Sequence, residues 1–176
     1  NTTNGKLGDN GAGSLPAGAG PRHIAFHPSE KWAYVINETA ISVTAFDFDK
    51  GTGKLTQKGT VSALPPGQSA AGVSGAEIFV HPNGKYVYAS TRVFNSIVQF
   101  SIASDGALTR VANVTTGANR PRNFGIDPSG SFLFAGNQDA AHVVGFGIDS
   151  SSGALTSIGK STDVAGPAFV GLSYVP

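Results

Sequence analysis

The sequence predicts an all-β protein assembled from repeated four-stranded units, because two markers recur and no helical period is found. The first marker is a turn with Pro at its second position, followed by a short apolar strand; it occurs at residues 27–31, 81–85 and 127–131. The second marker reads Gly-x-Leu-Thr and occurs at residues 53–56, 106–109 and 153–156. Both return at intervals of roughly 50 residues, which is typical of proteins that repeat one supersecondary unit. No stretch shows the apolar spacing of an amphipathic helix.

Each repeat is interpreted as four short strands. In the first repeat we expect strands at residues 22–27, 32–37, 40–47 and 55–61, where β-branched and aromatic residues are frequent and often alternate with others. Pro and Gly between the first two strands are turn-forming residues. Four-stranded units with a period of about 40 to 55 residues are typical of β-propeller blades. We therefore expect a β-propeller of four-stranded antiparallel blades. A sandwich of short strands is the alternative, and it fits the shared internal order of the repeats less well.

The markers divide the chain into parts of one incomplete propeller domain. We expect the Gly-rich end of a preceding blade, three full blades and a closing strand, at residues 1–20, 21–65, 66–119, 120–165 and 166–176. Residues 4–7 match the second marker, and residues 167–172 resemble the first strand of a further blade. About three and a half blades are too few for a ring, since propellers have roughly four to eight. The expected partner is a missing N-terminal half of the propeller or a second copy of the chain.

The composition argues against several classes of function. The 176 residues include no Cys, so neither a disulfide framework nor a thiolate metal site is expected. Four His without ligand-like spacing predict no metal, and no cofactor motif is found. A net charge of +1 without a basic run argues against nucleic acid, and no apolar run is long enough for a membrane span. The compartment stays open between cytoplasmic and secreted; formal glycosylation sequons begin at Asn1, Asn37 and Asn113.

Candidate functional residues emerge when the repeats are aligned with one another. Four columns flank the first two strands of each blade, and two of them are polar in every blade and chemically different in each. They read Arg22, Ala76, Arg122; His23, Glu77, Asn123; Asn37, Thr91, Asn137; and Glu38, Arg92, Gln138. A column that only builds blades would tend to keep one residue type. Because loops at a propeller's channel mouth carry function, we expect a site there.

These residue types suit the chemistry of an anionic substrate. Arg22, Arg92 and Arg122 offer guanidinium groups, which bind planar carboxylates and phosphates with two hydrogen bonds. His23 or a carboxylate such as Glu38 can transfer a proton. The alternative interpretation is structural: salt bridges between Arg22 and Glu38, and between Glu77 and Arg92, would fasten the blades to one another or stabilise single blades.

Other conspicuous residues are interpreted as structural. His27 and His81 occupy the same turn in two blades, where the third blade has Asp127, so all three are expected to cap that turn. Trp32 occupies a strand position that is aromatic in every blade, and we expect it in the core.

Residues 18–28, Gly-Ala-Gly-Pro-Arg-His-Ile-Ala-Phe-His-Pro, and the following Ala-Tyr-Val-Ile-Asn-Glu at 33–38 resemble the fingerprint of the lactonase family of seven-bladed β-propellers. Further similar runs lie at residues 76–78, 90–92, 121–128 and 135–138. The family includes bacterial phosphogluconolactonases and fungal carboxymuconate lactonizing enzymes. The resemblance covers roughly residues 18–176 and corresponds to the C-terminal half of family members, which are about twice as long.

The resemblance implies a seven-bladed ring and a metal-free enzyme that acts on a sugar lactone or a muconate-type carboxylate, by lactone hydrolysis or by lactonization. It implies active-site roles for Arg22, Glu38 and Arg92, while a further His of that site would fall in the missing half. Thr91 stands where the family usually has Asn. The alternative is a non-catalytic propeller that serves as a scaffold or a ligand-binding module.

Two groups of site residues follow from both arguments. The expected catalytic residues are Arg22, His23, Glu38 and Arg92. The expected substrate-binding residues are Glu77, Arg122, Asn123, Asn137 and Gln138.

Overall fold

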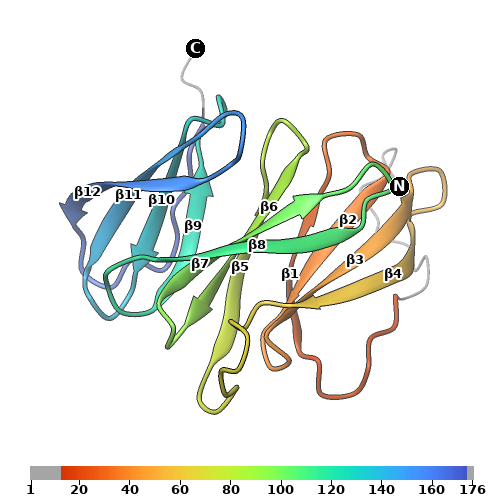
Figure 1. The fold of residues 1–176 in the computed structure, drawn as a ribbon, viewed down its shortest axis with the longest axis horizontal. Helices are drawn as coiled ribbons and strands as arrows, with labels where there is room; N and C mark the ends of the chain where they lie inside the picture. The colour runs from red at the N-terminus through yellow and green to blue at the C-terminus, as the bar shows by residue number, and fades with distance from the viewer. Residues whose placement is uncertain (1–12, 174–176) are drawn as a thin grey trace, which may run out of the picture.

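Three four-stranded antiparallel sheets form the protein, as a computed structural model that describes residues 13–173 shows (Figure 1). The first contains β1 (Pro21–Phe26), β2 (Trp32–Asn37), β3 (Ser42–Asp49) and β4 (Lys54–Ser62). The second contains β5 (Ser74–Val80), β6 (Tyr86–Arg92), β7 (Ser96–Ile102) and β8 (Leu108–Thr115). The third contains β9 (Pro121–Ile126), β10 (Phe132–Asn137), β11 (His142–Ile148) and β12 (Leu155–Asp163). The expected all-β fold of four-stranded propeller blades is confirmed, and no helix occurs within residues 13–173.

Within each blade, consecutive strands pair in sequence order, and this register creates the edge on which the candidate site lies. The first strand begins where the second strand ends: Pro21 pairs with Asn37, Ser74 with Arg92 and Pro121 with Asn137. Residues just after the start of a first strand therefore lie beside residues that follow a second strand. The four aligned columns thus meet at one edge of the blades.

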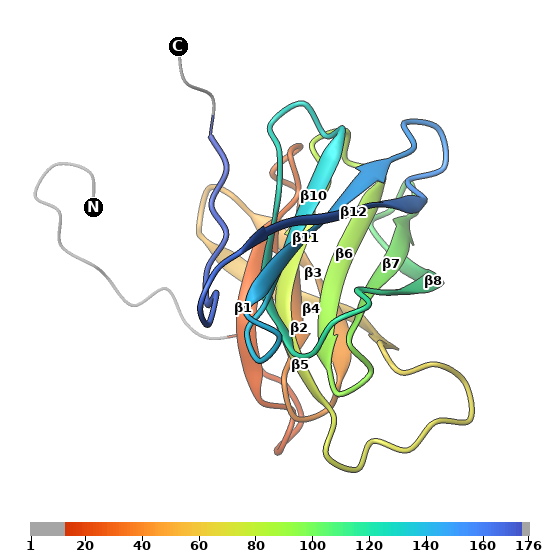
Figure 2. The ribbon, with the colours of Figure 1, turned by 90° about the vertical axis from the view of Figure 1, so that its left-hand side faces the viewer.

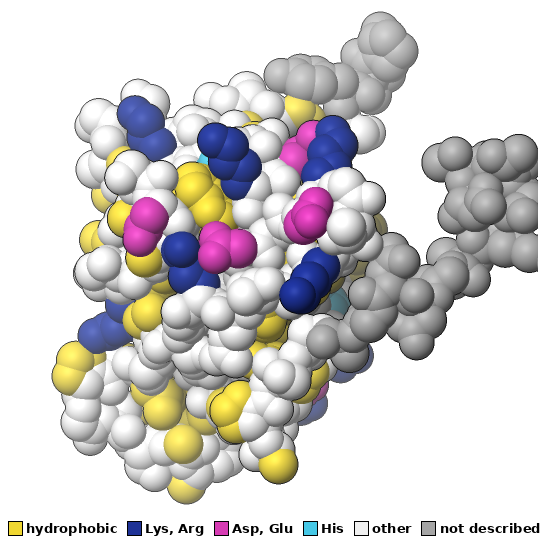
Figure 3. Space-filling view, turned by 90° about the vertical axis from the view of Figure 1, so that its right-hand side faces the viewer, with side chains coloured by type: hydrophobic (Ala, Val, Ile, Leu, Met, Phe, Trp, Pro, Cys, Tyr) yellow, Lys and Arg dark blue, Asp and Glu magenta, His cyan; other side chains and the backbone are white. Residues whose placement is uncertain are grey.

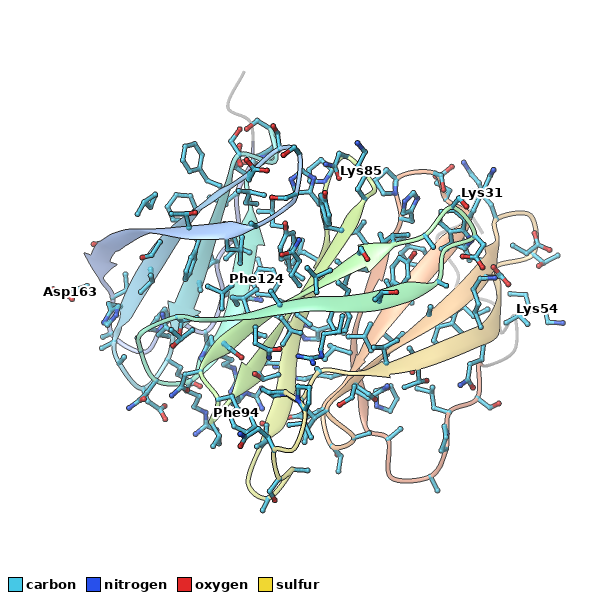
Figure 4. All side chains as sticks on the ribbon, viewed as in Figure 1. Lys31, Lys54, Lys85, Phe94, Phe124 and Asp163 are labelled. Atoms are coloured by element: carbon cyan, nitrogen blue, oxygen red, sulfur yellow. The ribbon has the colours of Figure 1, made fainter. Side chains whose placement is uncertain are left out.

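The core lies between neighbouring blades, which pack face to face. Tyr34, Val43 and Phe100 belong to the cluster between the first and second sheets. Phe124 and Phe146 belong to the cluster between the second and third sheets, where Phe124 is seen in Figure 4. Each such side chain contributes about 1.5 to 3 kcal/mol when fully buried. Because β1 contacts β5 and β5 contacts β9, the first strands form one continuous surface.

The turn between the first and second strands also links each blade to the next. The Nδ1 atoms of His27 and His81 accept the backbone N–H two residues later, at 3.0 and 3.1 Å, as does a carboxylate oxygen of Asp127, at 3.0 Å. This confirms the expected turn caps. In addition, His27 Nε2 donates to the Gly84 carbonyl at 2.9 Å, and His81 Nε2 donates to the Gly130 carbonyl at 2.8 Å. Each histidine therefore connects two blades.

The segment after β12 differs from the expectation. Residues 167–172 were expected as a strand, but the structure assigns none there. The segment instead runs back beside the first strands (Figure 2), where Val170 N–H donates to Asn123 Oδ1 at 2.7 Å. The physical reason is that a first strand takes its hydrogen-bond ladder from the second strand of its own blade, and no second strand follows this segment within the described residues. The expected blade end at residues 4–7 lies outside the described residues.

The surface on the side of the first blade carries Lys or Arg and Asp or Glu side chains interspersed with one another (Figure 3). Across the part of the chain that the structure describes, no helix has the length and apolar character that a membrane crossing requires.

Candidate active site

A carboxylate that joins two guanidinium groups lies at the centre of the candidate site. Glu38 follows the end of β2, Arg22 lies near the start of β1, and Arg92 ends β6 of the next blade. Arg92 Nη1 donates to Glu38 Oε1 at 2.6 Å, and Arg22 Nε lies 3.5 Å from Glu38 Oε2. The antiparallel register of the first blade brings Arg22 to Glu38, and the packing of the second blade against the first brings Arg92 to the same carboxylate.

The charges at this centre favour an ionised Glu38. The hydrogen bond from Arg92 lowers the pKa of Glu38, and the positive charges of Arg92, Arg22 and Arg122 act in the same direction. Burial lowers the pKa of Arg22, with Arg92 as the next cause. Two guanidinium groups thus contact one carboxylate, with Arg122 near enough for its charge to act on it, and the net positive charge of this cluster favours an anionic ligand.

A histidine–carboxylate pair forms the second half of the site. His23 Nδ1 lies 2.6 Å from Glu77 Oε1, and the same oxygen accepts the Ile78 N–H at 3.0 Å. The other Glu77 oxygen accepts the Asn123 side-chain amide. Glu77 is only 5% exposed, so these donors replace water around a buried carboxylate. Because Nδ1 donates to Glu77, the Nε2 atom of His23 is left as the acceptor, and Arg22 Nη1 lies 3.2 Å from it.

A cleft of about 620 Å³ opens along the first strands beside His23. Arg22, His23, Glu77 and Asn123 supply its polar end, and the rest is lined by residues of β1 and β5 together with Phe169 of the segment after β12. This volume and this mixture of apolar walls with few polar groups suit a small organic ligand. No group of three or more side chains that could hold a metal ion occurs among residues 13–173.

The structure separates the remaining expected site residues. Arg122 Nη1 donates to Gln138 Oε1 at 3.4 Å, within the third blade. Arg122 still lies near enough to influence the pKa values of Arg22 and Glu38. Asn123 lines the cleft, but its side-chain amide donates to Glu77 and its Oδ1 accepts the Val170 N–H.

One aligned column points into the blades instead of into the cleft. Asn137 is 0% exposed, and its Nδ2 donates to the Ala135 carbonyl at 3.2 Å. In the first blade Asn37, equally buried, donates to Ser42 and Thr44 on the neighbouring strand. Thr91 bonds to Ser96 in the same way in the second blade, at 2.8 Å. In the first two blades this column therefore ties the second strand to the third, and burial argues against the expected ligand-binding role of Asn137.

The alternative interpretation, in which these residues form salt bridges that stabilise the blades, holds in part. The expected pair of Arg22 and Glu38 is present. The expected pair of Glu77 and Arg92 is not what the structure shows, because Glu77 bonds to His23 and Asn123 whereas Arg92 bonds to Glu38 and Ser74. Both residues lie at the same edge, but their nearest partners of opposite charge come from the first blade.

Sequence reasoning missed Ser74, Arg120 and Asp139, which lie next to the chosen columns. Ser74 and Arg120 are two residues before the column of Arg22, and Asp139 is one residue after the column of Glu38. These positions also differ between blades, although Gly20 and Val93 in two of them are not polar. Extending the alignment outward by two residues would have found them.

Comparison with known proteins identifies the family of the chain. The profile of the family described as Lactonase, 7-bladed beta-propeller matches residues 1–172. The 6-phosphogluconolactonase of Bacillus subtilis (strain 168) is 37% identical over 167 residues, which are 94% of this chain and 48% of the relative. That of Pectobacterium carotovorum is 34% identical over 88% of this chain and 46% of the relative. The chain thus spans about half the length of the curated relatives it matches.

Solved structures show the same relationship. A protein from Lactobacillus plantarum superimposes with a TM-score of 0.88 at 30% identity, over 92% of this chain and 47% of its own. The periplasmic gluconolactonase of Pseudomonas aeruginosa gives a TM-score of 0.79 at 27% identity, over 86% of this chain and 42% of its own. The named relatives are lactonases, so they support lactone hydrolysis and not the lactonizing reaction. The chain belongs to the lactonase family of seven-bladed β-propellers.

Proposed function

We propose that the protein hydrolyses a sugar lactone in the cleft beside His23, and that the substrate is small and anionic. The observation that carries the proposal is the hydrogen-bonded pair of His23 and Glu77, which lines the cleft. Glu38 binds two guanidinium groups beside this pair. The relatives named as 6-phosphogluconolactonases and gluconolactonase support the reaction class.

His23 is the general base in the proposed mechanism. When a water molecule replaces Arg22 Nη1 as the hydrogen-bond donor to Nε2, Nε2 accepts a proton from that water while the water oxygen attacks the lactone carbonyl carbon. Glu77 holds Nδ1–H and stabilises the imidazolium that forms, as a buried carboxylate does in histidine-based hydrolysis. The ring C–O bond then breaks, and the leaving oxygen takes the proton from Nε2. The product is the open-chain sugar acid, and His23 returns to its neutral form.

Arg22, which lines the cleft beside His23, stabilises the negative charge that develops on the carbonyl oxygen, and Arg92 holds it in place through their shared carboxylate Glu38. Preorganised donors at such a position contribute most when they need no rearrangement during the reaction. Glu38 supplies that preorganisation, because it binds both guanidinium groups. With its pKa lowered, Glu38 stays ionised at neutral pH and is a poor proton donor there. Among the expected proton carriers, the geometry therefore favours His23.

We also propose that further blades close the cleft. Ile24 and Phe26 on β1 face it and are half exposed, so the first strands leave an apolar wall open to solvent. A closed propeller needs more than three blades. A preceding N-terminal half or a second copy of the chain would cover this wall, and the native mass of the intact protein distinguishes a monomer from a dimer.

A non-catalytic propeller is the second candidate function. The observation that favours it is the ion pair between Arg92 of the second blade and Glu38 of the first, which would fasten two blades without any substrate.

The test is the rate of lactone hydrolysis by His23→Asn in the intact protein, with δ-gluconolactone and its 6-phosphate as substrates and the spontaneous rate subtracted. We expect kcat to fall by about 10²- to 10⁴-fold, the usual contribution of a general base. His142→Asn is the matched control, because His142 lies on β11 and bonds to the Ala140 carbonyl. Undiminished turnover by the His23 variant would remove this residue from the mechanism. Absence of turnover in the unmodified protein would favour the non-catalytic candidate.

A further inference from the structure

The segment after β12, residues 167–172, packs closely against the third blade at two glycines. A Cβ added to Gly125 of β9 would lie 2.8 Å from the Val170 carbonyl oxygen, and one added to Gly136 of β10 would lie 3.1 Å from Val170 Cγ2. The aligned positions of the other two blades all have a Cβ: Ala25, Ile36, Phe79 and Ser90. Two residues without a Cβ therefore let the segment approach the backbone of the third blade.

This contact fixes the orientation of a side chain at the cleft. The Val170 N–H donates to Asn123 Oδ1 at 2.7 Å. Because a backbone N–H can only donate, the oxygen of the Asn123 amide faces the segment, and its Nδ2 is left to donate to Glu77. Asn123 is only 4% exposed, so both ends of its amide are used inside the protein. Phe169 of the same segment lines the cleft.

The order of donors and acceptors continues through Glu77 to His23. One Glu77 oxygen accepts from Asn123, and the other accepts the Ile78 N–H at 3.0 Å and lies 2.6 Å from His23 Nδ1. A carboxylate held in this way presents an acceptor to the ring, so Nδ1 carries the proton and Nε2 keeps its lone pair. The position of this one proton decides whether Nε2 can act as a base.

We propose that the segment at residues 167–172 is a working part of the active site, in which Val170 and Asn123 are positioning residues that keep the proton of His23 on Nδ1. The proposal rests on the proposed function, because it concerns the base of that reaction. If the segment moves away from β9, the Asn123 amide is free to turn its oxygen toward the Glu77 carboxylate, which repels it. Glu77 then holds Nδ1–H less well, and a larger share of the rings carries the proton on Nε2.

The experiment measures the tautomer of His23 directly. The intact protein is labelled with nitrogen-15 histidine, and NMR records the ring nitrogens at a pH where the ring is neutral, with His23→Asn to identify the signals. We expect the proton on Nδ1 in the unmodified protein. Gly125→Ala should displace Val170 and lower the share of this tautomer by about half. Gly147→Ala is the matched control, because Gly147 lies in the same blade and the nearest listed neighbours of its added Cβ would be 3.9 Å away.

The kinetics of lactone hydrolysis give a second measurement. Gly125→Ala should lower kcat by about three- to tenfold and change KM by less than about twofold, because proton transfer is impaired and substrate binding is not. Gly125 is not among the residues that line the cleft, so a direct effect on substrate binding is not expected. Asn123→Leu removes both hydrogen bonds of the amide at similar size and should shift the tautomer further than Gly125→Ala.

Three outcomes would overturn the proposal. The first is a His23 ring that carries its proton on Nε2 in the unmodified protein. The second is an unchanged tautomer in Gly125→Ala or in Asn123→Leu, and the third is an equal change in Gly125→Ala and Gly147→Ala. If Gly125→Ala does not fold, Val170→Pro takes its place, because it removes the N–H donor. A tautomer that responds to Gly125→Ala in a protein without lactone turnover supports the link to His23 and contradicts only the proposed hydrolysis.

Discussion

At the scale of single residues, Glu38 determines the chemistry of the candidate site. Its carboxylate accepts from Arg92 across the gap between two blades and lies near Arg22 of its own blade. The same contacts fit a fastener and a preorganised anion site, so the stability of the fold and the activity have to be measured together. Glu38 is 39% exposed, so solvent screening limits what the pair adds to stability.

We predict that Glu38→Gln lowers the free energy of unfolding by no more than about 1 kcal/mol at pH 7, as expected for a solvent-screened pair. The effect depends on pH, because the arginines lower the pKa of Glu38 below its ordinary value of 4.5. A lowered carboxylate pKa stabilises the folded state above the ordinary value, and this contribution disappears as the pH falls through the folded value. The difference between variant and unmodified protein should therefore shrink below pH 4.5. Urea denaturation at several pH values measures it.

The same variant separates two roles of the Glu38 ion pairs, a preorganised anion site and a fastener between blades. If the arginines stabilise a developing oxyanion, kcat for the lactone should fall at pH 7 although the variant is still folded. If the ion pair only fastens blades, the variant should lose stability and keep its kcat. A stability difference that stays constant down to pH 3 would contradict the pH argument.

At the scale of strands and turns, the sequence predicted which residues meet but not which way they point. The recurring turn and Gly-x-Leu-Thr markers define the strands, and the register then brings the aligned columns to one edge. However, the last residue of β10 lies in the strand, whereas the next residue begins the turn that follows it. Asn137 and Gln138 are neighbours in sequence, yet only Gln138 reaches Arg122. Nothing in the sequence distinguishes the two, because both columns are polar.

The turn after the second strand of each blade contains backbone strain that a single substitution can relieve. Its last residue has a positive φ in all three blades: Ile41, Asn95 and Ala141, at 48°, 48° and 53°. Asn tolerates this conformation better than Ala. We predict that Ala141→Asn raises the free energy of unfolding by about 0.5 to 1 kcal/mol. Thermal unfolding measures the change, with Ala140→Asn in the same turn as the control. An unchanged or lower melting temperature for the Ala141 variant would show that strain is not limiting there.

At the scale of the whole molecule, the sequence repeats predicted the blades. The contacts between neighbouring blades are seen only in the structure. His27 and His81 were expected to cap their own turns, and each also bonds to a carbonyl of the next blade. The segment at residues 167–172 shows the limit of the repeat argument. It resembles a first strand in sequence, but a strand needs a hydrogen-bonded neighbour, and the described residues provide none. A local sequence pattern therefore predicts a strand only where a neighbouring strand is present to pair with it.

Substitution of Gly130 tests how strongly the contact between the second and third blades depends on the hydrogen bond from His81 to the Gly130 carbonyl. Its φ is 77°, and a Cβ at this position would lie 2.6 Å from His81 Cε1. Gly130→Ala therefore combines backbone strain with displacement of the histidine that donates to the Gly130 carbonyl. Gly117→Ala is the matched control, because its φ is 68° and no atom lies within 4 Å of the added Cβ. We expect the control to cost about 1 kcal/mol from strain alone, and Gly130→Ala to cost roughly 1 to 3 kcal/mol more from the lost buried hydrogen bond. Urea denaturation measures both values, and equal losses would mean that His81 adjusts without weakening the contact between blades.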